Sequence, residues 1–306
     1  EIYTIFKSAN FIGQNILFGT KHGLLQTKDY ISAILQPNWV TDIGQPVQII
    51  DNVLYPKNIN HFANTFIRTW DDSLNPVTGK IYSTKNQGLS WHKLKMPTIA
   101  TDTETILPLA TAFQVSSERV ESGTGILKTY EWYTVYNLGT NHGLYTATVK
   151  EGLTDDEWDW TYQSYLSTDT TVYSALEIVT LHEAWDGDGN LTETFDRRLY
   201  VGAETGFFVN GYLISSEPVK GIYWLKEGSN PRKNNIIWYT DHDVFVTHTA
   251  ELIEAGDARY YAHPLSYFQQ ADIVQLTAAK AATTNDINDF ASGCPSVVDG
   301  VVLSVG

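Results

Sequence analysis

Three histidines recur at one position of a repeated pattern and are the first residues whose type suggests chemistry. His22, His142 and His242 each stand between two short apolar runs. A shared zinc ion would need its ligand atoms within about 2.3 Å of the metal. Equivalent positions of a ring of repeats lie too far apart for that. We therefore interpret these histidines as turn residues that bond the neighbouring backbone.

The acidic segment "DGDGNLTETFD" (186–196) is the second candidate. It places Asp186, Asp188 and Asn190 at alternate positions, as in a calcium loop, and oxygen ligands suit Ca²⁺. The sixth position is Leu191 instead of glycine, and the twelfth is Arg197 instead of glutamate. A polar hairpin tip is the favoured alternative. Calcium is the only cofactor that the sequence suggests.

The chain repeats one sentence of apolar run, polar turn and apolar run. It reads "LFGTKHGLLQTKD", "NLGTNHGLYTA", "YVGAETGFFVN" and "WYTDHDVFVTH", with a looser copy from Asn64 to Asn86. This is the pattern of a β-hairpin, and glycine supplies the positive φ of its turn. We expect hairpins at 14–28, 64–86, 133–148, 197–210 and 235–248. The anchor residues that follow the turns are Gly23, Lys80, Gly143, Gly206 and Asp243.

The spacing of these hairpins predicts the fold. Consecutive anchors are 37 to 63 residues apart, which is typical of a β-propeller with four-stranded blades. No long stretch has helical periodicity. We predict an all-β fold with one domain over 1–306 and six antiparallel blades, five recognisable and one partial ("VVDGVVLSVG"). Either "EIYTIFKS" helps to close the ring, or the remaining strands belong to a longer parent chain.

One copy carries a more specific motif. Thr84, Asn86, Gly88, Ser90 and Trp91 resemble the Asp-box, the turn of sialidase-like and related propellers, with Asn86 in place of the usual aspartate. In that family the box joins the third and fourth strands of a blade. A small polar side chain bonds the turn backbone, glycine takes the left-handed position, and tryptophan packs beneath. We expect Trp91 to be largely buried.

The resemblance implies two possible chemistries. A sialidase would need three arginines on one carboxylate; Arg68 and Arg198 lie on hairpin strands, but the Arg-Ile-Pro signature is absent. Another glycosidase would need two carboxylates about 5 to 9 Å apart. The loop acids are Asp71, Asp72, Asp155, Asp156, Glu157, Asp241 and Asp243. Their spacing pairs none of them, so ordinary strand and loop charges are the favoured interpretation.

Composition narrows the partners. The formal charge is −15, with 20 basic and 35 acidic residues, and no cluster of Lys and Arg suits nucleic acid. No apolar run of about 18 residues exists, so we expect no membrane insertion. The single cysteine, Cys294, excludes an internal disulfide framework. A virion, the extracellular space or a cell surface is the expected location.

These observations favour a non-catalytic propeller that serves as a structural or binding platform. Its partners would be proteins of a larger assembly, such as a phage tail or virion, or surface glycans. The alternative is a glycan-active hydrolase of the Asp-box type. The stretches 70–80, 97–124 and 184–196 are expected to be long loops, where recognition usually occurs.

Overall fold

The computed structural model of the 306-residue chain describes part of its length, and structural statements concern that part only. The described residues are 2–7, 16–27, 43, 46–50, 53–54, 65–71, 78–84, 90–100, 105–122, 129–150, 153–154, 157–185, 191–225, 235–248, 263–264, 276–280, 296–298 and 301–305. The chain forms two compact units. Unit 1 comprises 1–169 and 181–196, and unit 2 comprises 170–180 and 197–306.

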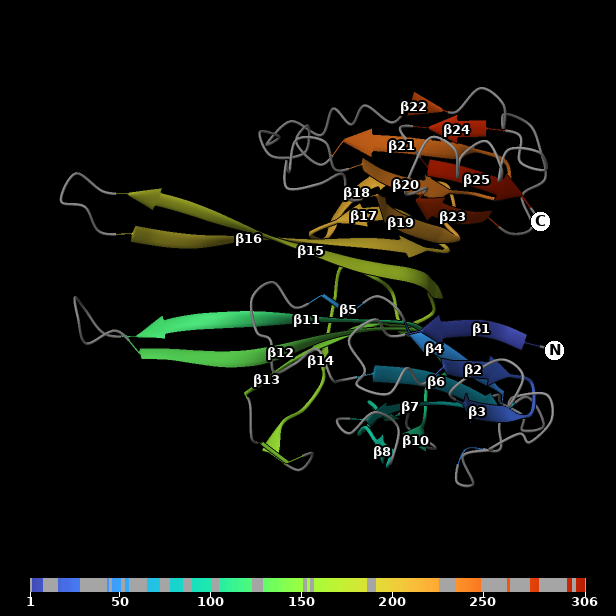
Figure 1. Cartoon of the computed structure of the whole chain (residues 1–306), viewed down its shortest axis with the longest axis horizontal. Helices are drawn as coiled ribbons and strands as arrows, with labels where there is room; N and C mark the ends of the chain where they lie inside the picture. Colours follow the sequence, from blue (N-terminus) through green and yellow to red (C-terminus); the bar gives the residue numbers. More distant parts are fainter. Residues whose placement is uncertain are drawn as a thin grey trace. The chain divides into compact units, whose positions relative to one another are not determined.

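Unit 1 contains four sheets that follow one another along the chain (Figure 1). The first has the order β1-β2-β3, with β1 Ile2–Lys7, β2 Ile16–Thr20 and β3 Gly23–Thr27. The second has the order β4-β6-β7-β8, with β4 Val47–Ile50, β6 Thr65–Asp71, β7 Thr78–Thr84 and β8 His92–Lys93. The N-terminal strand pairs antiparallel with β2, so "EIYTIFKS" belongs to the sheet of the first hairpin.

The third sheet is the largest of unit 1. Its order is β14-β13-β12-β11-β5, with β5 Val53–Leu54, β11 Ala110–Ser122, β12 Thr129–Thr140, β13 Gly143–Lys150 and β14 Thr161–Tyr162. All neighbours are antiparallel except β5, which pairs parallel with β11. A separate two-stranded sheet joins β9 Ile99–Ala100 and β10 Thr105–Ile106.

Unit 2 continues the antiparallel pattern. One sheet has the order β15-β16-β17-β18, with β15 Val172–Trp185, β16 Leu191–Ala203, β17 Gly206–Val209 and β18 Tyr212–Ser215; residues 181–196 of its first two strands are grouped with unit 1. The next has the order β19-β20-β21-β22, with β19 Gly221–Leu225, β20 Asn235–Tyr239, β21 Val244–His248 and β22 His263–Pro264. The last has the order β23-β25-β24, with β23 Leu276–Lys280, β24 Ser296–Val298 and β25 Val301–Val305.

The all-β prediction is confirmed, and the described residues contain no α-helix. All five expected hairpins are present as the antiparallel pairs β2–β3, β6–β7, β12–β13, β16–β17 and β20–β21. "VVDGVVLSVG" forms the pair β24–β25. A closed ring of six blades stays a prediction. Within the described part, no helix is both long and apolar enough to cross a membrane.

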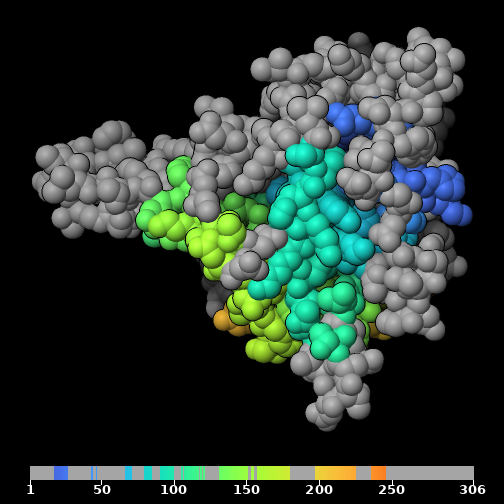
Figure 2. Space-filling view, turned by 90° about the horizontal axis from the view of Figure 1, so that it is seen from below, coloured from blue at the N-terminus to red at the C-terminus, as the bar shows by residue number. Residues whose placement is uncertain are grey.

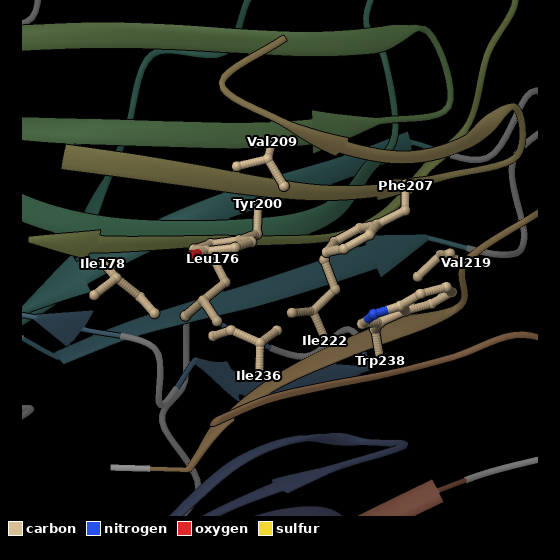
Figure 3. Packing of buried hydrophobic residues seen from close by; sticks show 9 residues of the cluster. All are labelled: Leu176, Ile178, Tyr200, Phe207, Val209, Val219, Ile222, Ile236 and Trp238. Carbon is tan, nitrogen blue, oxygen red and sulfur yellow. The ribbon is translucent and has the colours of Figure 1, made fainter. Parts of the chain in front are cut away.

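Each core cluster joins residues of two consecutive sheets. In unit 1, Phe66 and Ile81 of the second sheet pack with Phe113, Leu138 and Tyr145 of the third. In unit 2, Tyr200 and Phe207 pack with Ile222, Ile236 and Trp238 of the following sheet (Figure 3). The rings of Phe207 and Trp238 are stacked with centroids 4.9 Å apart. Alternate side chains of each strand therefore bury one face of a sheet against the next sheet.

The three expected long loops are shorter than predicted. Residues 97–124 contain β9, β10 and β11, so the interpretation of this stretch as a loop is wrong. The 184–196 stretch is strand except for 186–190, because β15 ends at Trp185 and β16 begins at Leu191. In the 70–80 stretch, strand residues reach Asp71 and resume at Thr78. Their polar composition conceals strands that extend beyond the core.

Candidate functional site

A buried threonine hydroxyl closes most of the repeated hairpins. Thr140 Oγ1 donates to the carbonyl of Gly143, its cross-strand partner, at 2.9 Å and accepts from the His142 N–H at 2.9 Å. Thr20 makes the same two bonds with Gly23 and His22 at 2.9 and 3.1 Å. Side chains of this kind satisfy turn backbone groups that the strand ladder leaves unpaired.

Two further hairpins repeat the bond with longer distances. Thr240 Oγ1 lies 3.5 Å from the Asp243 carbonyl, and Thr69 Oγ1 lies 3.5 Å from the Lys80 carbonyl. These carbonyls belong to the anchor residues predicted from the sequence. The fifth anchor, Gly206, faces Ala203 instead of a threonine. The sequence analysis missed these threonines, although Thr-x-His recurs three residues before an anchor in three copies.

The histidines of the repeat lie in turns, as expected. His142 Nδ1 is 3.1 Å from the Thr168 carbonyl, which fits the predicted contact with backbone. Gly23, Gly143 and Gly206 have φ values of 132°, 88° and 140°, in the region that glycine adopts without steric cost. Among the described residues, no three His, Cys, Asp or Glu side chains form a group suited to a metal ion.

The Asp-box lies where the resemblance places it in the chain order. Thr84 ends β7, and His92 begins β8, the third and fourth strands of their sheet. Trp91 is half-buried and packs against a cluster that contains Leu17, Leu24 and Ile67. It is therefore less enclosed than expected. Asn86 and Gly88 lie outside the described residues.

The calcium candidates Asp186, Asp188 and Asn190 also lie outside the described residues, between β15 and β16. The acidic groups of the loops have other partners where they are described. Glu157 accepts bonds from the backbone N–H and hydroxyl of Thr154, both at 2.8 Å. Asp241 lies 3.6 Å from the ammonium group of Lys220. These contacts fit ordinary loop charges.

The arginines and buried amides brace neighbouring strands. The Arg68 guanidinium donates to the carbonyls of Ala110 and Thr111 at the start of β11, and its desolvation lowers the pKa of Arg68 to about 10. Arg198 is buried. Arg197 binds Glu177 with two bonds of 3.0 and 2.9 Å.

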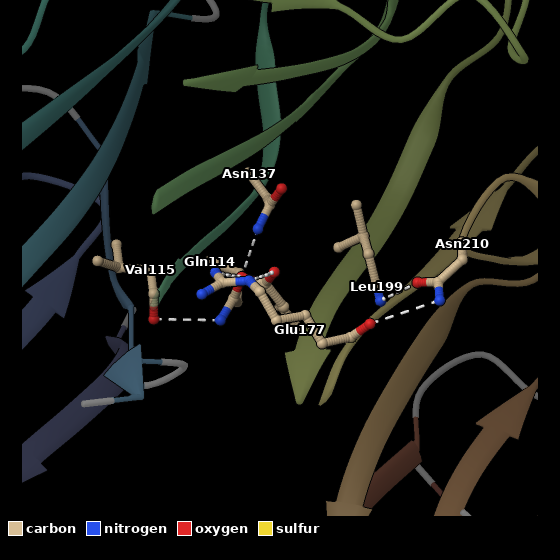
Figure 4. Close-up of polar contacts among 7 residues, drawn as sticks. Gln114, Val115, Asn137, Glu177, Leu199 and Asn210 are labelled. Carbon is tan, nitrogen blue, oxygen red and sulfur yellow. Dashed lines mark hydrogen bonds and ion pairs between the residues drawn. The ribbon is translucent and has the colours of Figure 1, made fainter. Parts of the chain in front are cut away.

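Two groups of polar contacts are drawn in Figure 4. In unit 1, Asn137 donates to Gln114 at 2.8 Å within a cross-strand pair. In unit 2, Asn210 accepts a bond of 2.8 Å from the Leu199 N–H. These bonds satisfy buried and strand-end polar groups, which is a structural role.

A cavity of about 280 Å³ in unit 1 gathers positive charge in a strongly acidic protein. Its lining includes the side chains of Lys80, Lys93 and Lys95 together with Leu94, Met96 and Leu107. Lys80 and Lys93 belong to the neighbouring strands β7 and β8, and Lys95 follows β8. In Figure 2 the blue-green residues of this region lie beside the green and yellow-green residues of and after the third sheet.

The three lysines of the cavity differ in their contacts. Lys95 Nζ lies 3.1 Å from the Trp158 carbonyl and 3.3 Å from Asp159 Oδ1, and the Trp160 indole donates to the Lys95 carbonyl at 2.9 Å. Lys80 is half-buried, and Lys93 is exposed. Within the described part of the chain, neither has a hydrogen-bond or ion-pair partner. The cavity thus contains one neutralised and two uncompensated ammonium groups.

A second feature of unit 1 is an arm formed by β11 and β12 beyond the end of β13. The pairing of β12 with β13 stops at Tyr133, whereas β11 and β12 stay paired out to Ser122 and Thr129. Residues 119–122 and 129–132 are therefore a two-stranded ribbon, visible in Figure 1 as the outer part of the two long strands. Val120 in this arm is 41% exposed.

A charged contact secures the base of this β11–β12 arm. Lys150 Nζ lies 2.7 Å from Glu131 Oε1, and the Tyr133 hydroxyl donates to Glu131 Oε2 at 2.9 Å. The bonds from Lys150 and Tyr133 lower the pKa of the Glu131 carboxyl below its usual range. Glu131 is therefore ionised at neutral pH and holds the last residue of β13 against the arm.

Comparison with known proteins adds no assignment. No family model matches the chain, and no curated protein matches it. The likeness to Asp-box propellers stays a prediction based on residues 84–91 and on the hairpin repeat.

Proposed function

We propose that this chain is a β-propeller that acts as a non-catalytic platform for a protein partner in a larger assembly, such as a phage tail or virion. The observation that carries the proposal is the β11–β12 arm. An isolated two-stranded ribbon is only marginally stable in water. This ribbon has no third strand beyond Tyr133 among the described residues, and it exposes Val120. A partner strand that adds to its edge would cover both the backbone groups and the apolar side chain.

The propeller part of the proposal rests on the order of the sheets. Four-stranded antiparallel sheets recur along the chain, and each core cluster joins a sheet to its successor. Blades of a propeller pack in this manner. A ring of such blades would provide a rigid base for a projecting arm, and recognition elements are most effective on rigid scaffolds.

The test shortens the arm and measures assembly. Glu118 and Tyr133 face each other, so replacing 119–132 by Asn-Gly, the preferred two-residue turn, removes the arm and keeps all pairs with β13. The chain is co-expressed with the products of neighbouring genes, and complexes are detected by native mass spectrometry. We expect the wild type to form a defined complex and the shortened variant to remain alone with an unchanged unfolding temperature.

Point variants provide the matched control. Val120→Asp should prevent complex formation, because it places a charge where an apolar contact is expected, whereas Val120→Ile should retain the complex. Complex formation by the shortened variant would contradict the role of the arm. Glycan hydrolysis that disappears when one carboxylate is changed to its amide would replace the platform by the hydrolase alternative.

A further inference from the structure

The register of β7 and β8 places like charges opposite each other. Tyr82 pairs with Lys93, and the Leu94 N–H donates to the Ile81 carbonyl at 2.9 Å. Continued by one residue, this antiparallel register brings Lys95 opposite Lys80. Like charges at opposite positions destabilise a sheet. Asp159 offsets the charge of Lys95, but the charges of Lys80 and Lys93 are left for another group to balance.

The cavity is suited to a small ligand with one charged end. Its volume of about 280 Å³ is close to the lower end of small-molecule sites. Leu94, Met96 and Leu107 supply apolar surface beside the lysines, and Leu107 is 49% exposed. Lysine binds anions as a mobile point charge. A single ring that carries an acidic group can contact both the ammonium groups and the apolar wall, whereas a peptide segment would need a groove.

We infer that this cavity binds a small organic carboxylate of about the size of one acidic sugar, with Lys80 and Lys93 as the groups that bind the carboxylate. The site extends the proposed platform with a ligand of its own. It rests on the cavity and not on the β11–β12 arm, so the variant with the shortened arm should bind the carboxylate as the wild type does.

The experiment is isothermal titration calorimetry of the full chain at low ionic strength with sodium glucuronate, methyl β-glucuronide, glucose and sodium sulfate. We expect both glucuronates to bind, glucose not to bind, and sulfate to bind more weakly because it has no apolar face. Lys80→Gln and Lys93→Gln should each weaken binding by about tenfold, the effect of one lost charge-assisted bond. Lys150→Gln, which removes the same charge from the base of the arm, should leave the dissociation constant unchanged.

Exposed Leu107 allows a test that does not disturb the core. Leu107→Lys should tighten glucuronate binding, Leu107→Asp should weaken it, and Leu107→Gln should lie between them. Lys80→Gln without ligand should be as stable as the wild type or slightly more stable, because it relieves repulsion; a structural lysine would give the opposite result. No heat with either glucuronate, equal binding of glucose or sulfate, or unchanged binding by the Lys80→Gln/Lys93→Gln variant would overturn the inference.

Discussion

The hydroxyl of Thr140 shows how much a single buried atom can contribute to a turn. It is fully enclosed and serves as donor to Gly143 and acceptor from His142. Thr140→Val keeps the shape of the side chain and leaves two backbone groups without their partner. We expect a loss of about 1 to 3 kcal/mol in the free energy of unfolding, measured by urea denaturation. Thr140→Ser keeps the hydroxyl; a loss as large as that of valine would show that the bond is unimportant.

Trp91 tests the Asp-box resemblance at the same scale. Its ring packs against Leu17 and Ile67, while its indole nitrogen is buried without a hydrogen-bond partner in the described part of the chain. Trp91→Ala should cost roughly 2 kcal/mol, less than a fully buried aromatic residue. Trp91→Phe keeps most of the apolar contact and removes the indole N–H, so it should cost less. Equal stability of the alanine variant and the wild type in thermal unfolding would mean that the motif has no structural role.

Asp159 moderates the charge of the lysine cavity. The Trp160 backbone N–H and the Lys95 ammonium hold the pKa of its carboxyl below the usual range, so it is ionised at neutral pH. Asp159→Asn removes a negative charge that competes with a bound anion. The side chain is 79% exposed, and solvent screening limits the expected gain in glucuronate affinity to roughly twofold. Glu157→Gln, which removes a nearby charge bonded to Thr154, should leave the affinity unchanged.

At the scale of elements, the turn between β17 and β18 determines how an edge strand folds back. Asn210 and Gly211 have φ values of 49° and 83°, as in the two-residue turns that suit twisted hairpins. The Asn210 side chain also accepts a bond from the Leu199 N–H on β16. Asn210→Ala should cost about 2 kcal/mol, from the left-handed backbone and the lost bond together. Asn210→Gly loses only the bond, and chemical denaturation should place it between alanine and the wild type.

At the scale of the whole molecule, the proposed closed ring makes a simple prediction about size. A compact domain of this length has a radius of gyration of roughly 19 Å. We expect small-angle X-ray scattering of the monomer to give a value near this, raised slightly by the arm. Two units separated in solution would give a clearly larger radius and a bimodal distance distribution, and that result would exclude the single ring.

The hairpins were predictable because their signals are local. Alternating apolar residues and a glycine at Gly23 or Gly143 define both strands and the turn within about 15 residues. The outer half of β11 was missed because residues such as Ser117, Glu118 and Glu121 lack that alternation. A strand with no core on either face carries no apolar period. Its length is determined by pairing with β12, which a single stretch of sequence does not reveal.

The lysine cavity was not predictable for a related reason. Lys80 and Lys93 are separated by 13 residues in the sequence and come together only through the register of β7 and β8. The threonines, by contrast, left a readable signal. Thr20, Thr140 and Thr240 each stand three residues before an anchor, which would have indicated a shared turn bond.

The Asn210–Gly211 turn also determines how this protein ages. An asparagine followed by glycine can cyclise when the glycine nitrogen attacks the side-chain amide carbon, and the succinimide that forms opens to aspartate or isoaspartate. In the native hairpin the Asn210 side chain is bonded to β16, which holds the amide away from that attack. Fraying of β18 would release it. Each converted molecule would gain a negative charge and lose the bond to Leu199, so stored material should accumulate an acidic, less stable form from this one exposed turn.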